Sequence, residues 1–430
     1  MASTTGNTES TSVSKPQRIR WAISFVLFLA VISAFFDRIS IAVLFTNVSF
    51  QNDMGIGYNP ALLGLLMTSF VFAYGLSGLF LSFVGDLYGP RRGLAWGSAL
   101  WGVSMLLMGS AGSFASMLVY RIILGITEGP QFALINTLIK RWFPAREQAR
   151  ANSIWMMGSP LGSAIGFPIT IYLAANYGWR TSFYVLAALN LLIVLPLVLL
   201  LVRDRPDTPV APVVKIAETT SYLDQVRLFF YDWRFWMLVI FNSSALVYLW
   251  GLNGWLPSYL IKVRHFDLKQ AGIYSSLPFI FMFAGEVLSA ILSDRIGRRA
   301  TVCFLSLFGA GISMYLVSTI EDNYTAAFMI AVSAFFWGSA LPSLFALGLE
   351  ILPARAVGAG VGVYNGVGNL IGAFAPLAMG LIIAKTGDYD AGLLVIVGAA
   401  ILGSVSMLPL MFKNSRAGTV DSLEGSLPSA

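Results

Sequence analysis

Four charged residues lie inside apolar stretches of the chain, where a lipid bilayer disfavours them. Asp37 and Arg38 fall in the first long apolar run, and Arg121 and Glu128 fall in the fourth. A charge near the bilayer centre costs about 2.5–3.5 kcal/mol on insertion scales, so such residues persist where they face a bundle interior or a water-filled path and have partners there. An acid and a base in each of two runs indicate an anion site that is coupled to proton transfer.

The elements that must position these charges are membrane helices. Apolar residues make up 57% of the 430 residues and charged residues 11%, whereas a soluble domain carries about 25% charged residues. A spanning helix needs roughly 20 apolar residues. The sequence therefore predicts an all-α membrane protein with twelve transmembrane helices in the lipid bilayer, at 21–45, 60–84, 93–111, 115–139, 152–175, 181–202, 235–260, 270–292, 301–318, 324–349, 357–384 and 390–412.

The composition excludes several kinds of chemistry. Cys303 and His265 are the single cysteine and the single histidine, which excludes a disulfide framework and a zinc cage. We expect no cofactor, no metal and no enzymatic activity, and carboxylates remain as the proton carriers. Most of the 27 Lys and Arg residues fall on one side if both termini are cytoplasmic. The positive-inside rule therefore explains the basic charge, and we expect no nucleic-acid partner.

The chain divides into two halves that repeat one another. The apolar runs and the polar stretches between them predict five regions. These are a cytoplasmic tail (1–20), a six-helix bundle (21–202), a cytoplasmic linker (203–234), a second six-helix bundle (235–412) and a cytoplasmic tail (413–430). Three residue types recur at a separation of 208: Asp86 and Asp294, Gly89 and Gly297, and Arg91 and Arg299. A parallel repeat of six spans is typical of transporters whose halves rock about a central site.

The loop after the second span, Asp86-x-x-Gly89-x-Arg91-Arg92, resembles the signature loop of the major facilitator superfamily. The copy departs from the family pattern at Ser82, where glycine is usual, and at Leu87, where a basic residue is common. In the second copy Ala290 replaces the glycine. The resemblance covers almost the whole chain and implies two six-helix bundles.

Within that superfamily the chain is similar to the anion:cation symporter family. The similarity rests on a set of segments: Phe36-Asp37-Arg38-Ile39-Ser40, Tyr74, Arg121-x-x-x-Gly125-x-x-Glu128-Gly129, Trp142-Phe143-Pro144-x-Arg146, Gly178-Trp179-Arg180 and Trp255-Leu256-Pro257-x-Tyr259-Leu260. Members include bacterial importers of sugar acids and other carboxylates, most of them proton symporters, and animal organic-anion carriers. The resemblance implies a multi-pass protein of the cell inner membrane, which we expect to be a monomer.

The four buried charges can be given roles. We expect Arg38 to bind the substrate carboxylate, because a guanidinium offers two parallel donors and stays charged. Burial favours the protonated form of a carboxyl group, so Glu128 is the expected main proton carrier. Asp37 would be a second carrier whose proton affinity is set by Arg121. At 1.5 Å per residue, Asp37 and Arg121 fall near one depth and Glu128 lies about 10 Å nearer the cytoplasm.

Further residues are weaker candidates. Polar side chains that suit hydrogen bonds to a carboxylate or hydroxyl make up the other expected substrate-binding residues: Tyr74, Gln131, Tyr248, Asn253, Tyr364, Asn365 and Asn369. The repeated loops give the expected gating residues: Asp86, Gly89, Arg91, Arg92, Asp294, Gly297, Arg299 and Glu350. Glu286 in the eighth span is either a third proton site or the partner of a neighbour.

The sequence therefore predicts a secondary active transporter that imports a small organic anion with protons by alternating access. A sugar acid such as a hexonate or hexuronate is the first expectation. The alternatives are a proton-independent organic-anion exchanger, an importer of a small dicarboxylate, aromatic acid or sulfonate, and, for the four charges, a static structural network.

Overall fold

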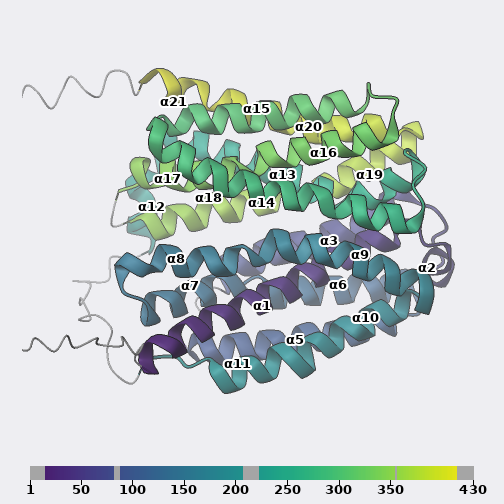
Figure 1. Ribbon diagram of the computed structural model, residues 1–430, viewed down its shortest axis with the longest axis horizontal. Coiled ribbons are helices and arrows are strands. Elements are labelled where there is room, and N and C mark those ends of the chain that lie inside the picture. The colour runs from purple at the N-terminus through teal and green to yellow at the C-terminus, as the bar shows by residue number, and fades with distance from the viewer. Residues whose placement is uncertain (1–14, 82–87, 207–221, 354–355, 414–430) are drawn as a thin grey trace, which may run out of the picture.

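The computed structural model describes residues 15–81, 88–206, 222–353 and 356–413. Within these ranges the regular secondary structure is helical throughout. Figure 1 shows two groups of helices, one from each half of the chain, lying side by side with their long axes roughly parallel. The ends at Lys15 and Lys413 lie at the same end of the molecule, which we call the terminal end; the opposite end is the far end.

The first half supplies six spans. They are α1 (Lys15–Val43), α3 (Pro60–Phe80), α5 (Pro90–Gly109), α6 (Phe114–Glu128) with α7 (Gln131–Trp142), α8 (Ala145–Met156) with α9 (Gly158–Tyr177), and α10 (Trp179–Ala188) with the π-helix η2 (Leu189–Val194) and α11 (Leu195–Leu201). The short η1 (Leu44–Thr46) and α2 (Val48–Asp53) connect α1 to α3 at the far end.

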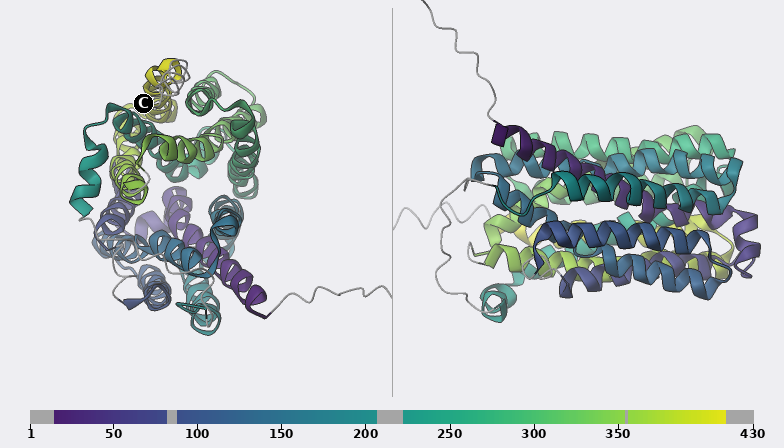
Figure 2. Two further views of the ribbon diagram at one scale, coloured as in Figure 1. Left: turned by 90° about the vertical axis from the view of Figure 1, so that its left-hand side faces the viewer. Right: turned by 90° about the horizontal axis from the view of Figure 1, so that it is seen from below.

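The second half repeats this arrangement. Its spans are α13 (Trp233–Lys262), α14 (Leu268–Ile296), α15 (Arg299–Val317), α16 (Asn323–Gly338) with α17 (Ala340–Ile351), α18 (Val357–Gly372) with α19 (Ala375–Thr386), and α20 (Tyr389–Ser406) with α21 (Leu408–Lys413). Residues 207–221 of the expected linker lie outside the described ranges, and α12 (Tyr222–Phe230) leads into α13. Seen end on, the two groups of helices face each other (Figure 2).

Eleven helical segments of the described chain are long and apolar enough to cross a membrane. The twelfth expected span corresponds to α5, which has 20 residues and packs against α6 and α10. Arg91 and Arg92 in its first turn, together with glycines and serines, make α5 less apolar than the other spans. The chain therefore forms twelve spans, and hydropathy is weakest where the third begins.

Several expected single helices are interrupted near mid-span. The helix of span four is interrupted at Gly129 and Pro130, between α6 and α7. The corresponding span of the second half is interrupted at Ser339, between α16 and α17. Proline lacks the N–H of a continuous helix, so Pro130 accounts for the first interruption. Pro342, the third residue of α17, lacks the N–H that would bond to the carbonyl of Gly338, so it accounts for the second.

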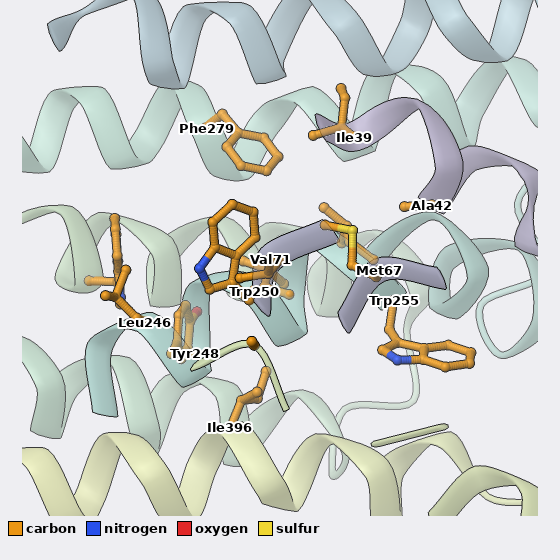
Figure 3. Close-up of a cluster of buried hydrophobic side chains, with 14 of the residues drawn as sticks. Ile39, Ala42, Met67, Val71, Leu246, Tyr248, Trp250, Trp255, Phe279 and Ile396 are labelled. Carbon is orange, nitrogen blue, oxygen red and sulfur yellow. The ribbon is translucent and has the colours of Figure 1, made fainter. Parts of the chain in front are cut away.

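The core between the halves is built from large apolar side chains. Figure 3 shows Ile39, Met67 and Val71 of the first half close to Trp250 and Phe279 of the second. The rings of Phe167 and Phe279 stack across the interface between α9 and α14 with centroids 5.5 Å apart. These contacts belong to one buried apolar cluster that includes residues of both halves.

Candidate functional site

The centre of the candidate site is an ion pair between α1 and the last residue of α6. Arg38 Nε donates to Glu128 Oε2 at 2.7 Å, and both side chains are buried, with exposed fractions of 2% and 0%. Arg38 Nη2 also donates to Gln131 Oε1 at 3.3 Å, and Gln131 Nε2 donates to the carbonyl of Ala30. One guanidinium therefore spans the interruption between α6 and α7, because it bonds residues on both sides of it.

Aromatic rings enclose the same guanidinium. Its carbon lies 4.5 Å from the ring centroid of Phe35, 4.6 Å from that of Tyr74 and 5.4 Å from that of Phe132. Cation–π contacts of this kind are worth about 2 kcal/mol or more when the cation is desolvated. They hold Arg38 inside the bundle without adding a second negative charge.

Asp37, which points about 100° away from Arg38 around α1, forms a separate polar cluster. Its Oδ2 accepts a hydrogen bond of 2.8 Å from Asn190 Nδ2, and Asn190 Oδ1 accepts one of 2.9 Å from Ser33. Asn190 lies in the π-helix of span six, and π-bulges occur frequently at functional sites. Sequence reasoning missed Asn190, although it is the single amide side chain in the apolar run 181–202.

Arg121 lies next to Asp37, but its hydrogen bond goes to the main chain of Asp37 rather than to the carboxylate. Arg121 Nη1 donates to the main-chain carbonyl of Asp37 at 3.4 Å, and Arg121 Nε donates to the carbonyl of Leu66 at 3.2 Å. Its guanidinium also lies 4.5 Å from the ring centroid of Phe70. Carbonyl acceptors are available to Arg121 where α1, α3 and α6 meet, while Asn190 holds the carboxylate. The contact between Arg121 and Asp37 agrees with the expectation that these two residues lie at a similar depth in the membrane.

Two carboxylate oxygens of the site have no hydrogen-bond partner among the described residues. They are Asp37 Oδ1 and Glu128 Oε1, and both residues have an exposed fraction of 0%. Both side chains therefore face the protein interior rather than lipid. A protonated carboxyl group carries one O–H donor, so each free oxygen is a position at which a proton can be held.

Tyr74 connects this site to the second half. Its ring contacts that of Trp250 in α13 with centroids 6.5 Å apart, and Trp250 Nε1 donates to Asn369 Oδ1 at 3.2 Å. Asn369 Nδ2 donates to the carbonyl of Asn365 at 3.0 Å. The structure thus brings together Arg38, Gln131, Tyr74 and Asn369, and adds Trp250, which sequence reasoning missed.

The other polar candidates of the second half lie apart from Arg38. The hydroxyl of Tyr248 is 2.5 Å from Ser333 Oγ, and its ring stacks on Trp337 within the second bundle. Asn253 Oδ1 and the hydroxyl of Tyr364 are buried without a partner in the described chain. Tyr248 is therefore engaged in helix packing, whereas Asn253 and Tyr364 keep hydrogen-bonding capacity.

The loop residues of the first half form a brace at the terminal end. Asp86 lies outside the described residues. Gly89 caps the start of α5, just before Pro90, with φ of +84°, and the main-chain N–H of Arg91 donates to Asp204 Oδ1 at 2.9 Å. A side chain at position 89 would meet that carboxylate at 2.9 Å. Glycine is therefore required both by the positive φ and by the close approach of Asp204. Arg92 is exposed. Asp204 was not anticipated.

The corresponding residues of the second half form a similar brace. Gly297 ends α14 in the left-handed conformation, and Arg299 pairs with Glu350 at 3.2 Å. The side chain of Asp294 lies outside the described part of the chain. Glu286 lies on α14, and no hydrogen bond or ion pair to it is found among the described residues.

The two halves contact each other closely at the far end. The rings of Phe45 and Trp255 meet edge to face between the halves. Within the second half, Trp255 Nε1 donates to the carbonyl of Pro376 at 2.9 Å and so fixes the orientation of the indole. The main-chain N–H of Leu377 donates to Thr68 Oγ1 at 3.2 Å, and the hydroxyls of Tyr58 and Tyr389 are in contact. The contacts between the halves join the bundles on the far-end side of Arg38.

Comparison with known proteins identifies the family and its transporter relatives. The family model of the Major Facilitator Superfamily matches residues 27–376. The chain is similar to a "Probable sulfoacetate transporter" of Cupriavidus necator, with 30% identity over 94% of this chain and 98% of that one. It is also similar to the hexuronate transporter of Bacillus subtilis, with 26% identity over 89% of this chain and 92% of that one. A third relative is the D-galactonate transporter of Escherichia coli, with 26% identity over 95% and 99% of the two chains.

Solved structures give the same fold. A bacterial homologue of the human lysosomal transporter Spinster, in an inward-facing and unoccupied conformation, superposes with a TM-score of 0.76 at 21% identity, over 93% of this chain and 95% of that one. A D-xylose–proton symporter superposes with a TM-score of 0.73 at 17% identity, over 90% and 97% of the two chains.

Proposed function

Because the chain belongs to the Major Facilitator Superfamily and its relatives transport organic anions, we propose that it imports a sugar acid together with protons by alternating access. The observation that carries the proposal is the buried ion pair of Arg38 with Glu128. The same guanidinium is the best-placed anion binder of the site, and its present partner is a titratable carboxylate.

The pair provides a physical basis for coupling. Removing one partner of a buried ion pair costs about 3–5 kcal/mol, because the remaining charge is left uncompensated. Arg38 therefore requires one anion at a time, either the Glu128 carboxylate or the carboxylate of the cargo. Protonation of Glu128 at its free Oε1 removes the internal anion and leaves Arg38 for the cargo. When the cargo and the proton have left, the Glu128 carboxylate pairs with Arg38 again.

The neighbours of Arg38 support a hydroxylated cargo. Gln131 and Tyr74, which contact Arg38, and Asn369, which lies beyond Trp250, carry amide and phenol groups. Such groups can bond to sugar hydroxyls as both donors and acceptors. The relatives named for hexuronate and D-galactonate carry substrates of this class. A second candidate is a short sulfonate, which the similarity to the sulfoacetate transporter over nearly the whole chain favours.

The test is accumulation by purified protein in proteoliposomes with an imposed pH gradient. A gradient of one pH unit supplies about 1.4 kcal/mol per proton, or about tenfold accumulation for each coupled proton. We expect accumulation of D-galactonate or a hexuronate, with sulfoacetate and a small dicarboxylate as competing cargoes. Uptake that never exceeds equilibration for any of these anions would favour the proton-independent exchanger.

Glu128→Gln is the sharpest single substitution. We expect it to abolish accumulation driven by the pH gradient and to retain exchange of labelled against unlabelled cargo, because glutamine mimics the protonated acid and cannot release a proton. Glu321→Gln, at an exposed acid of the far end, is the control and should accumulate normally. Wild-type accumulation by Glu128→Gln would exclude Glu128 as the carrier.

We also propose that the terminal end faces the cytoplasm of a cell whose inner membrane holds the protein as a monomer. Arginines concentrate at this end, among them Arg20, Arg91, Arg92, Arg203, Arg205, Arg295 and Arg298. Positive loops remain on the cytoplasmic side during insertion, so their distribution supports the orientation.

A further inference from the structure

A groove of about 450 Å³ lies between α5 and the last helix of span six at the terminal end of the first half. Small and apolar residues form most of its walls: Ala95, Ala99, Leu195 and Leu199. Trp96 borders it with an exposed fraction of 71%. The groove therefore opens on the outer face of the bundle, where lipid chains surround the protein.

Two arginines stand at the mouth of this groove. Arg91 Nη2 donates to the carbonyl of Leu199 at 2.6 Å, so the guanidinium bridges from α5 to α11. Arg91 Nε is buried and has no hydrogen-bond partner among the described residues. Arg92 is exposed and forms no described ion pair. The mouth thus carries two positive charges, and the exposed guanidinium of Arg92 is the one without a described ion pair.

Asp204, an acidic residue near this mouth in the described part of the chain, already accepts a hydrogen bond from the main chain. Asp204 Oδ1 accepts the main-chain N–H of Arg91, which places its charge at the start of α5 rather than in the groove. Arg203 and Arg205 flank Asp204 in the sequence and are exposed. Among the described residues, the charge at the groove mouth is therefore positive even with Asp204 counted.

We propose that this groove binds an anionic phospholipid of the leaflet next to the terminal end. The lipid phosphate accepts hydrogen bonds from Arg91 and Arg92, and one acyl chain lies over Ala95 and Ala99. Guanidinium groups bind phosphate through parallel donors, and basic pockets between transmembrane helices bind anionic head groups. With the orientation proposed above, this leaflet is the cytoplasmic one.

The depth of the residues matches a lipid rather than a free phosphate. Ala99 lies seven residues beyond Arg92, or roughly 10 Å further along the helix, so the apolar floor continues from the charged mouth towards the membrane centre. Trp96 lies between the two levels, and exposed tryptophan is typical of the membrane interface. A phosphate ion alone would leave the apolar part of the groove unused.

A second groove on the other side of Trp96 strengthens the assignment. It measures about 390 Å³ and is lined by residues that include Gly97, Trp101, Pro130 and Gln131. Trp101 Nε1 is buried without a partner in the described chain. A lipid with its head group at Arg92 can therefore place a chain on each side of Trp96.

The test is lipid binding to delipidated full-length protein, followed by native mass spectrometry. Phosphatidylglycerol is the anionic probe, phosphatidylcholine the zwitterionic one, and glycerol 3-phosphate the head group without chains. We expect phosphatidylglycerol to bind more tightly than phosphatidylcholine and glycerol 3-phosphate to fail to compete. Arg92→Gln should weaken phosphatidylglycerol about fivefold, the effect of one surface arginine on an anionic lipid. Ala99→Leu fills the groove, keeps both arginines and should weaken both lipids.

Arg150→Gln is the matched control, because Arg150 is an exposed arginine that does not line the groove. It should keep the wild-type preference. Equal binding of the two lipids by the wild type, or an unchanged preference in Arg92→Gln, would overturn the proposal. Displacement of the lipid by glycerol 3-phosphate would also overturn it and would identify a site for soluble phosphate.

Discussion

At Asp37 the two carboxylate oxygens have different surroundings. Oδ2 is held by Asn190, and Oδ1 has no hydrogen-bond partner among the described residues. A proton on Oδ1 would leave the bond from Asn190 intact, so the carboxyl group can change its charge without changing its orientation. This arrangement suits the proposed second proton carrier.

Asn190→Ala tests whether the amide supports Asp37. The substitution leaves Oδ2 of Asp37 and the hydroxyl of Ser33 without partners, and each unsatisfied buried group costs about 1–3 kcal/mol. We expect a loss of stability of that size in detergent-micelle unfolding, together with reduced proton-driven accumulation. Asn176→Ala removes a surface amide that bonds its own helix and should change stability by less than about 0.5 kcal/mol. Equal effects of the two substitutions would contradict the role.

Asp53 offers a pH-dependent test outside the spans. Its carboxylate accepts hydrogen bonds from Arg180 and from Trp179 Nε1, and these bonds hold the pKa of Asp53 below its usual value. An acid with a lowered folded-state pKa stabilises the fold above its unfolded pKa of about 3.9, and this contribution is lost as the pH falls through the folded value.

We therefore expect Asp53→Asn to lower the Tm at pH 7 and to approach the wild type as the pH falls below about 4. Thermal unfolding in detergent at stepwise pH is the measurement. Glu321→Gln, at the same end of the molecule, is the control. The difference between its Tm and that of the wild type should not follow the loss of the Asp53 interactions in acid. A wild-type advantage that stays constant or grows in acid would contradict the assignment.

At the scale of helices, close packing between α3 and α19 holds the far end together. A side chain at Gly380 would meet the carbonyl oxygen of Pro60 at 2.4 Å, and one at Gly64 would meet that of Pro376 at 2.4 Å. Small residues let membrane helices approach at this distance. The contact between the two halves therefore depends on glycine at both positions.

Gly380→Val should force α3 and α19 apart by roughly 1 Å, because carbon and oxygen atoms are not tolerated at 2.4 Å. We expect a Thr68→Cys reporter to react faster with an impermeant maleimide in this variant. The native Cys303 is buried and adds little background. Gly398→Val, where a side chain meets nothing within 4 Å, is the control. Unchanged labelling in Gly380→Val would show that this contact does not close the far end.

The helices were far more predictable than their interruptions. Length and hydropathy locate the spans because lipid requires long apolar segments. The π-helix around Asn190 closely precedes Pro196, and the interruption at Ser339 closely precedes Pro342. Length and hydropathy locate spans but do not register single prolines, although proline removes a helix hydrogen bond. From the sequence, Arg38 and Arg121 must have buried partners, but the sequence does not say which. The choice of Glu128, Gln131 or a main-chain carbonyl follows from how the helices meet.

At the scale of the whole molecule, the two halves contribute different chemistry. The buried charges Asp37, Arg38, Arg121 and Glu128 belong to the first half. Around them the second half supplies neutral groups, notably Trp250 and Asn369. The two repeats thus share a fold, but the proposed proton carriers, Asp37 and Glu128, both belong to the first half.

Orientation is a property of the whole molecule and can be tested with fusions. We expect alkaline phosphatase to be active when fused after Gly387, in the far-end loop before α20, and inactive when fused after Pro206 at the terminal end, because the enzyme folds only outside the cytoplasm. A fluorescent protein at the same two positions should give the reverse pattern. Phosphatase activity at Pro206 would place the arginine-rich end outside the cell.

The interruption of span four has a mechanical consequence. Glu128 is the last residue of α6 and Gln131 is the first of α7, and Arg38 bonds both. The guanidinium is thus a crosslink over a joint in the helix. When that crosslink is released, the two segments lose a shared restraint and can bend more freely relative to each other. A single hydrogen ion at Glu128 would in this way alter the stiffness of a membrane helix.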